Sequence, residues 1–261
     1  MNELLAKLTN LSYEFFSVIL PGFIAGIFLL IWWIAMGPIA PLWSFGFFPH
    51  LTANNTSLII ESLSLKTGIG VAVPSLTIAY FLGHILHWIA RSGRKPNESG
   101  EKGKNAWWRK VCYSPLFRSL LFRIPKPLKS YDERLQPLYD AVQAKFAVDG
   151  TKILWEQFFP VLKSYLAKNL TSSLVATYQS KYTLHRSITA AASGLFWVSI
   201  VGLVGGCISN YLTGTAPRWG LLVTLSLFAL LLVWGFSSSY IYYWKLFGNT
   251  IITESYSSIY G

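Results

Sequence analysis

Charged residues are scarce in this chain. Asp, Glu, Lys and Arg make up 13% of its 261 residues, against roughly 25% in soluble globular domains. Apolar residues make up 52%, and the mean hydropathy is +0.42. This composition excludes an intrinsically disordered chain and indicates several segments that are buried in protein or in lipid.

Cysteine is almost absent. Cys112 lies in a basic region and Cys207 inside an apolar run, so the two residues exclude a disulfide framework. The first residues carry an acid, Glu3, and lack a small-residue cleavage site after a short apolar core. We therefore expect no removable signal peptide.

Catalytic motifs are missing as well. The sequence contains no GxxxxGK[ST], no dinucleotide-binding glycine pattern, no GxSxG and no HExxH. We therefore predict a protein that is not an enzyme and that uses no cofactor.

Four long apolar runs contain no Asp, Glu, Lys or Arg at all: 15–36, 68–90, 187–211 and 219–244. Each is near or above the ~20 residues that a helix needs to cross a bilayer. The sequence predicts an all-α integral membrane protein with four transmembrane helices arranged as two hairpins. Coupled transport is disfavoured, because transporters keep ionisable groups at mid-membrane depth.

Cations directly after the second run set the orientation. Arg91, Arg94 and Lys95 mark the end of that run as cytoplasmic by the positive-inside bias, so both termini are predicted to be cytoplasmic. The predicted organisation has three parts: an N-terminal transmembrane hairpin (1–90), a basic cytoplasmic helical domain (91–186) and a C-terminal transmembrane hairpin with a cytoplasmic tail (187–261).

The excess positive charge lies entirely in the predicted cytoplasmic domain. Residues 91–186 hold 18 of the 22 Lys and Arg and 7 of the 11 acids. The difference, 18 − 7 = +11, equals the net charge of the whole chain. A basic segment beside membrane helices is more simply explained by anionic lipid headgroups than by nucleic acid, at ~1 kcal/mol per cation. The candidate lipid- or anion-binding residues are Arg91, Arg94, Lys95, Arg109, Lys110, Arg118 and Arg123.

Within this domain, the basic and aromatic segment 107–123 is predicted to lie along the headgroups. Residues 130–147 are predicted to form one helix, and 151–183 one or two more with a break near Pro160. No strand pattern is present, so a small helical bundle is expected.

Small residues predict close helix packing. Gly22 with Gly26 and Gly202 with Gly206 each form a GxxxG, a pattern that allows two membrane helices to approach closely. The second pair lies in an especially small-residue-rich run. These faces favour a homo-oligomer within the lipid bilayer.

Two histidines share a helix face near the end of the second run. His84 and His87 are three residues apart, a spacing that could begin a metal site or a proton relay. No Cys, Asp or Glu lies within a turn of them, whereas catalytic zinc takes three protein ligands. We expect a helix-contact or interfacial role, and no metal.

Three short motifs carry a resemblance: LPGF at 20–23, YFLGHILHWI at 80–89 and YxxxYxxHRS at 178–187. Together they resemble small bacterial four-helix inner-membrane proteins of poorly defined function. Some of those proteins are encoded beside nucleases or signalling enzymes in anti-phage defence loci. The resemblance implies a non-catalytic membrane effector that oligomerises and breaches the inner membrane once its cytoplasmic domain receives a signal.

The sequence therefore leaves three hypotheses about function open. The first is an oligomeric effector or channel that alters membrane permeability. The second is a membrane anchor or scaffold whose basic domain recruits a soluble protein, a nucleotide signal or lipid headgroups. The third is a lipid-modifying enzyme that uses His84 and His87.

Overall fold

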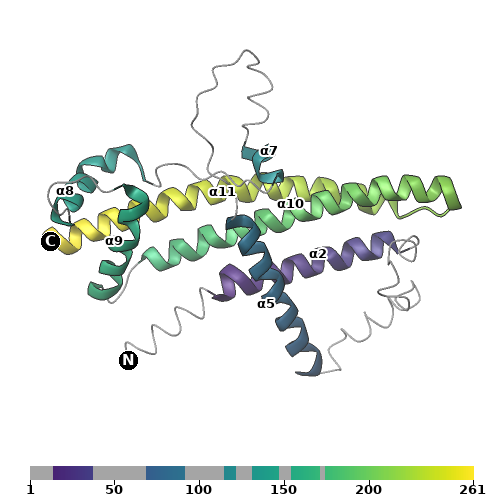
Figure 1. Cartoon of the computed structure of the whole chain (residues 1–261), viewed down its shortest axis with the longest axis horizontal. Helices are drawn as coiled ribbons and strands as arrows, with labels where there is room; N and C mark the ends of the chain where they lie inside the picture. Colours follow the sequence, from purple (N-terminus) through teal and green to yellow (C-terminus); the bar gives the residue numbers. More distant parts are fainter. Residues whose placement is uncertain (1–13, 38–68, 92–114, 122–130, 147–153, 171–173) are drawn as a thin grey trace, which may run out of the picture.

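The computed structural model describes residues 14–37, 69–91, 115–121, 131–146, 154–170 and 174–261 (Figure 1). Every regular element within these ranges is a helix, and no strand occurs among them. The all-helical class predicted from the sequence is confirmed.

Three helices are long and apolar enough to cross a membrane. They are the continuous pair η1 (Phe15–Ile19) and α2 (Leu20–Met36), then α10 (Leu174–Thr213) and α11 (Trp219–Tyr260), with 22, 40 and 42 residues. A fourth apolar helix, α5 (Ile69–Arg91), forms over the predicted run 68–90. These three helices indicate a helical membrane protein, while the fourth span, the two-hairpin layout and the side of the termini stay predictions.

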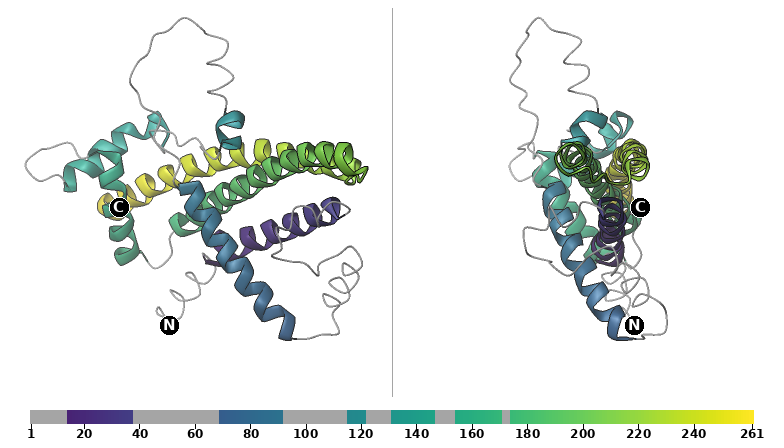
Figure 2. Two further views of the ribbon diagram at one scale, coloured as in Figure 1. Left: turned by 45° about the vertical axis from the view of Figure 1, so that its right-hand side comes forward. Right: turned by 90° about the vertical axis from the view of Figure 1, so that its right-hand side faces the viewer.

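The helices α10 and α11 form an antiparallel hairpin, and α2 lies beside them (Figures 1 and 2). Gly214 begins the tight turn with φ of +68°, a conformation that residues with a side chain rarely adopt. At this end the backbone N–H of Arg218 donates to the Ala35 carbonyl at 3.0 Å. At the other end the Ser187 hydroxyl donates to the Ser17 carbonyl at 3.4 Å. These two contacts show that α2 lies parallel to α10. The 18 residue steps from Ser17 to Ala35 span about 27 Å at 1.5 Å per residue.

The helix α5 crosses η1 and α2 obliquely at a point where the backbones touch (Figure 1). A Cβ atom on Gly22 would fall on the Ala79 carbonyl, and one on Gly83 would fall on the Val18 carbonyl. Away from this crossing the N-terminal half of α5 leaves the bundle (Figure 1). At the level of the crossing, the Ile78 and Phe81 side chains are 59% and 63% exposed.

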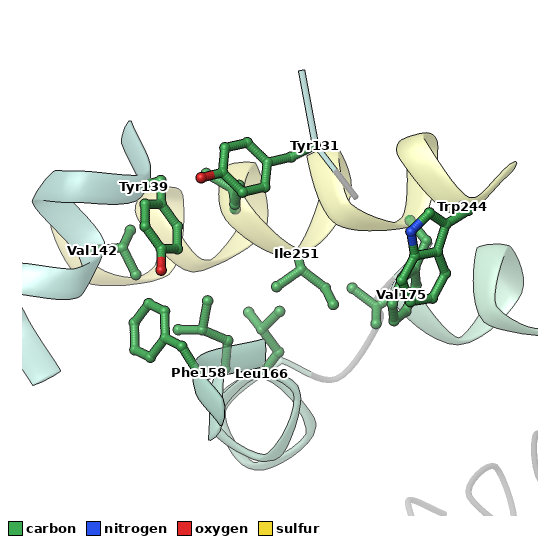
Figure 3. Packing of buried hydrophobic residues seen from close by; sticks show 11 residues of the cluster. Tyr131, Tyr139, Val142, Phe158, Leu166, Val175, Trp244 and Ile251 are labelled. Carbon is green, nitrogen blue, oxygen red and sulfur yellow. The ribbon is translucent and has the colours of Figure 1, made fainter. Parts of the chain in front are cut away.

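Short helices cover the end of the hairpin opposite the turn. η4 (Glu133–Leu135) leads into α8 (Gln136–Phe146), and α9 (Trp155–Asn169) packs beside it on the last turns of α11. Aromatic and aliphatic side chains fill this cap (Figure 3): Tyr131, Tyr139, Val142, Phe158, Leu162, Leu166, Val175, Trp244, Phe247, Ile251 and Ile252. We call these residues the cap cluster.

One expectation about local structure needs revision. α9 continues through Pro160, so the predicted break there is wrong. The proline ring is exposed, and the fully buried Phe158 and Leu162 beneath it outweigh the loss of one backbone donor. The apolar runs 187–211 and 219–244 belong to longer helices, because α10 and α11 run from the cap to the turn without interruption. The domain boundaries stay predictions.

Candidate functional site at the centre of α10

One stretch of α10 lies where this helix contacts α11, α2 with η1, α5 and α7. Seven consecutive residues, 187–193, are buried, so α10 is surrounded on every side there. They are serine, isoleucine, threonine, three alanines and serine, and such small residues let neighbouring backbones approach closely. We call residues 183–197 the α10 hub.

The start of α2 is held to the hub through a proline. Pro21 has no N–H to donate to the Ser17 carbonyl four residues earlier, and the chain forms a π-helical turn just before it. The Ser187 hydroxyl donates to that carbonyl. In lipid, a backbone carbonyl without a partner is costly, so this contact fixes the register of α2 on α10.

The short helix α7 (Pro115–Leu120) inserts against the hub from another side. Trp197 Nε1 donates to the Leu120 carbonyl at 2.7 Å. Ser193 Oγ lies 2.8 Å from the Ser119 carbonyl and 2.9 Å from the Thr189 carbonyl, so its single proton serves both oxygens. These donors satisfy carbonyls at the end of α7 that no helical N–H can reach.

The level of this contact bears on the predicted headgroup location of 107–123. At 1.5 Å per residue, Ser193 and Trp197 lie about 10 and 16 Å along α10 beyond Arg186, the last charged residue before the apolar stretch. Leu120 packs there against Ala192 and Val233. The α7 residues thus pack beside the apolar stretch of the hairpin, and the headgroup location of the whole segment stays a prediction.

The C-terminal end of α5 meets the hub through a histidine and an arginine. Arg186 Nη2 lies 3.5 Å from His87 Nε2. Around them Ala90, Ala190 and Tyr240 form a small buried cluster. His84, in contrast, is exposed and packs edge-on against Tyr80 with ring centroids 4.4 Å apart.

The two predicted histidines therefore have different neighbours. In the part of the chain that the structure describes, no three His, Cys, Asp or Glu residues lie close enough to hold a metal ion. The arrangement offers hydrogen bonds and positive charge, and these suit binding and packing.

Most of the predicted basic residues fall outside the described ranges. Arg94, Lys95, Arg109, Lys110 and Arg123 lie there, and their role stays a prediction. Arg91 is the last residue of α5. Arg118 lies on α7, where its side chain is half-buried.

The four glycines of the predicted pairs differ in how closely a neighbouring helix or turn approaches them. Gly22 touches the backbone of α5, but its counterpart in that crossing is Gly83, and a Cβ at Gly26 would meet only Leu82 Cδ1 at 3.9 Å. A Cβ at Gly202 would lie 3.0 Å from Met36 Sδ, and one at Gly206 would lie 2.5 Å from Pro217 Cγ.

The Gly202 and Gly206 face is thus occupied inside the chain. It packs on α2 and on the turn before α11, which leaves it no room for a second copy. Its observed partner is intramolecular, because the turn at 214–218 returns the chain directly over it.

Burial in the cap cluster changes the pKa of two tyrosines that lie outside the apolar stretches. The Tyr131 and Tyr139 rings stack with centroids 5.2 Å apart, and Tyr131 donates its hydroxyl proton to Gln136 Oε1 at 3.0 Å. Burial, with smaller contributions from Tyr131 and Asp140, raises the pKa of Tyr139 to about 12. Burial and the Asp140 charge also raise the pKa of Tyr131.

Several important residues were not singled out by sequence reasoning. Ser187, Ser193 and Trp197 hold neighbouring carbonyls, and Gly83 makes the backbone crossing, yet each is an ordinary residue of a membrane helix. Arg186 carried one usable signal, its position immediately before a long uncharged stretch. The chain matches no protein-family model, no curated protein and no solved structure.

Proposed function

We propose that this chain is a non-enzymatic membrane anchor that holds its helical cap at the membrane and couples the cap rigidly to the membrane helices. The observation that carries this proposal is the continuity of α10 and α11. Val175 in the cap cluster and Ala190 in the hub belong to one helix, and so do Ile251 and Val233. A displacement of the cap must therefore move the membrane segment with it.

The packing of the hub favours an anchor over a pore within one chain. Residues 187–193 are closed on all sides, and the exposed faces of the hairpin are apolar at Val201, Val204, Leu227 and Leu231. Apolar faces of this kind suit lipid rather than a water-filled path. The glycine face that suggested oligomerisation is occupied by the chain itself.

The proposed topology places the cap and both termini in the cytoplasm. Because α2 runs parallel to α10, Ser17 and Ser187 lie on one side of the membrane. Arg186 and Lys245 flank the apolar stretches on that side, and the excess positive charge of the chain lies in segments attached to it. In this topology α5 is a tilted fourth span whose cytoplasmic end is Arg91.

Membrane potential in bacteria that express the full chain tests the anchor. A potential-sensitive dye should report an unchanged potential while the protein is recovered from the membrane fraction. A loss of potential that follows induction would overturn the anchor and favour a permeability effector.

Photocrosslinking then tests which surface meets soluble partners. A photoreactive residue at the exposed Val161 on α9 should give a specific protein adduct in cells. The matched control is Val204 on α10, also exposed, which should give only lipid adducts. Equal protein adducts at both positions would contradict the proposed division between cap and lipid face.

A permeability effector is the second candidate, and an exposed apolar face of α5 favours it. Leu76, Ile78, Phe81 and Ile85 are all exposed along this helix. A second copy of the chain could cover this face, and an assembly of several copies could then enclose a path that a single copy lacks. Depolarisation together with a detergent-solubilised mass above that of one chain, both lost in Phe81→Ser, would support this candidate.

A further inference from the structure

Arg186 stands at the boundary between charged and uncharged parts of the hairpin. The α10 helix carries no Asp, Glu, Lys or Arg from Ser187 to Thr213, and α11 carries none from Trp219 to Trp244. The first charged residue after that stretch on α11 is Lys245. In membrane helices such a boundary lies at the level of the lipid headgroups.

The Arg186 side chain is only partly satisfied by protein. Its Nη2 lies 3.5 Å from His87 Nε2, but its buried Nε meets no hydrogen-bond acceptor. An unsatisfied buried donor on a charged group costs more than a neutral one. The side chain as a whole is half-buried, although its Nε has almost no exposed surface.

Within the described ranges, the groups around Arg186 do not neutralise its charge. His87 and Tyr240 lie against it, and Lys181, one turn and a half earlier, places its ammonium over the Tyr243 ring at 5.5 Å. Because Ser17 contacts Ser187, Glu14 is the described carboxylate that lies closest to the level of Arg186. Its side chain is exposed and forms no ion pair with Arg186.

An aromatic residue of the kind found at membrane interfaces stands next to this pair. Trp88 follows His87 on α5, and its side chain is 69% exposed. Tryptophan at the end of an apolar helix lies preferentially at the headgroup level. The place where α5 meets α10 thus combines a half-buried guanidinium, an imidazole and an exposed indole.

We propose that Arg186 and His87 form a binding site for a phosphate group, supplied by an anionic phospholipid of the adjacent leaflet. A phosphate presents several oxygens to the planar guanidinium, which binds such groups through parallel N–H donors. It would pair with the guanidinium and supply a negative charge that the described neighbours lack. This inference goes beyond the proposed function, because the site would exist whether or not the cap recruits a partner.

The test uses the full chain in mixed micelles with either phosphatidylglycerol or phosphatidylcholine, and native mass spectrometry counts bound lipid. Arg186→Gln should weaken phosphatidylglycerol binding about tenfold and leave phosphatidylcholine binding unchanged. The matched control is Lys245→Gln, which removes an exposed charge near the same boundary on α11. It should change binding less than twofold.

Two further arms separate the remaining explanations. Inorganic phosphate at millimolar concentration should not displace phosphatidylglycerol, and full displacement would identify a site for soluble phosphate instead. Arg186→Lys should retain more binding than Arg186→Gln, and circular dichroism should give equal helix content for both. Equal phosphatidylglycerol binding by wild type and a folded Arg186→Gln variant would overturn the proposal.

Discussion

The cap cluster and the α10 hub hold the same two helices together by different means. The cap uses large side chains: Tyr139 packs edge-on against Phe158 at one end, and Trp244 stacks on Phe247 at the other, with ring centroids 5.7 Å apart in each pair. Figure 3 shows Tyr139 and Phe158 at the opposite end of the cluster from Trp244. The hub uses alanines and serines, and its specific contacts are side-chain hydrogen bonds to neighbouring carbonyls.

The difference follows from the surroundings of each region. Outside the lipid, burial of aromatic surface removes it from water and supplies most of the stabilisation. In lipid the surrounding tails are as apolar as leucine, so close backbone packing and hydrogen bonds must supply it instead. The same helix therefore changes its composition along its length.

Truncation of a large cap residue should have the largest effect on stability. Phe158→Ala removes a fully buried ring and should lower the free energy of unfolding of the cap by about 3–5 kcal/mol. The matched control is Val161→Ala on the exposed face of the same helix, with an expected loss below about 0.5 kcal/mol. Denaturant titration of the detergent-solubilised protein, followed by circular dichroism, measures both.

Addition of a single methyl group to the glycine crossing should have the next largest effect. Gly22→Ala would place Cβ on the Ala79 carbonyl, and Gly83→Ala would place it on that of Val18. Each should lower stability by about 3 kcal/mol. Gly26→Ala has room and should change the melting temperature little or raise it. A loss at Gly26 equal to that at Gly22 would show that helix approach is not the reason.

Loss of one hydrogen bond at the hub should cost less. Trp197→Phe keeps the aromatic ring but removes the donor to the Leu120 carbonyl, at a cost of about 1 kcal/mol. Trp234→Phe on the exposed face of α11 is the control. The readout is labelling of a cysteine placed at Leu121 by a membrane-impermeant maleimide, which should become faster in Trp197→Phe only. Unchanged labelling would mean that the Trp197 hydrogen bond is not needed to hold α7.

Alkaline pH should weaken the cap through Tyr139. Tyr139 titrates near 12 in the folded cap, above the ordinary value of 10. Between these two values the unfolded chain loses this proton while the folded chain keeps it, so stability is full below about pH 10 and falls as pH rises toward 12.

The stability of the cap between pH 9 and 12 checks this sign. Tyr139→Phe should flatten the decline, whereas Tyr256→Phe, which changes an exposed ring on α11, should leave it unchanged. An equal slope in wild type and Tyr139→Phe would contradict a role for this tyrosine.

Sequence reasoning succeeded where the signal is local. The uncharged runs at 15–36, 187–211 and 219–244 each lie within a helix long enough to span a membrane, and the predicted helix 130–147 closely matches η4 and α8. It failed at Pro160, because the penalty of a proline depends on what packs beneath the helix. It also assigned Gly202 and Gly206 to contacts between chains.

The sequence by itself determined the class of the molecule, the position of its apolar helices and the segment that holds its excess charge. Length, hydropathy and charge are properties of a short stretch, and a bilayer responds to them directly. Only the tertiary structure decided that Gly83 meets α2, that α7 inserts beside Ser193 and Trp197, and that His87 faces Arg186. Small and hydroxyl residues occur throughout membrane helices, so which of them touch depends on how the helices cross.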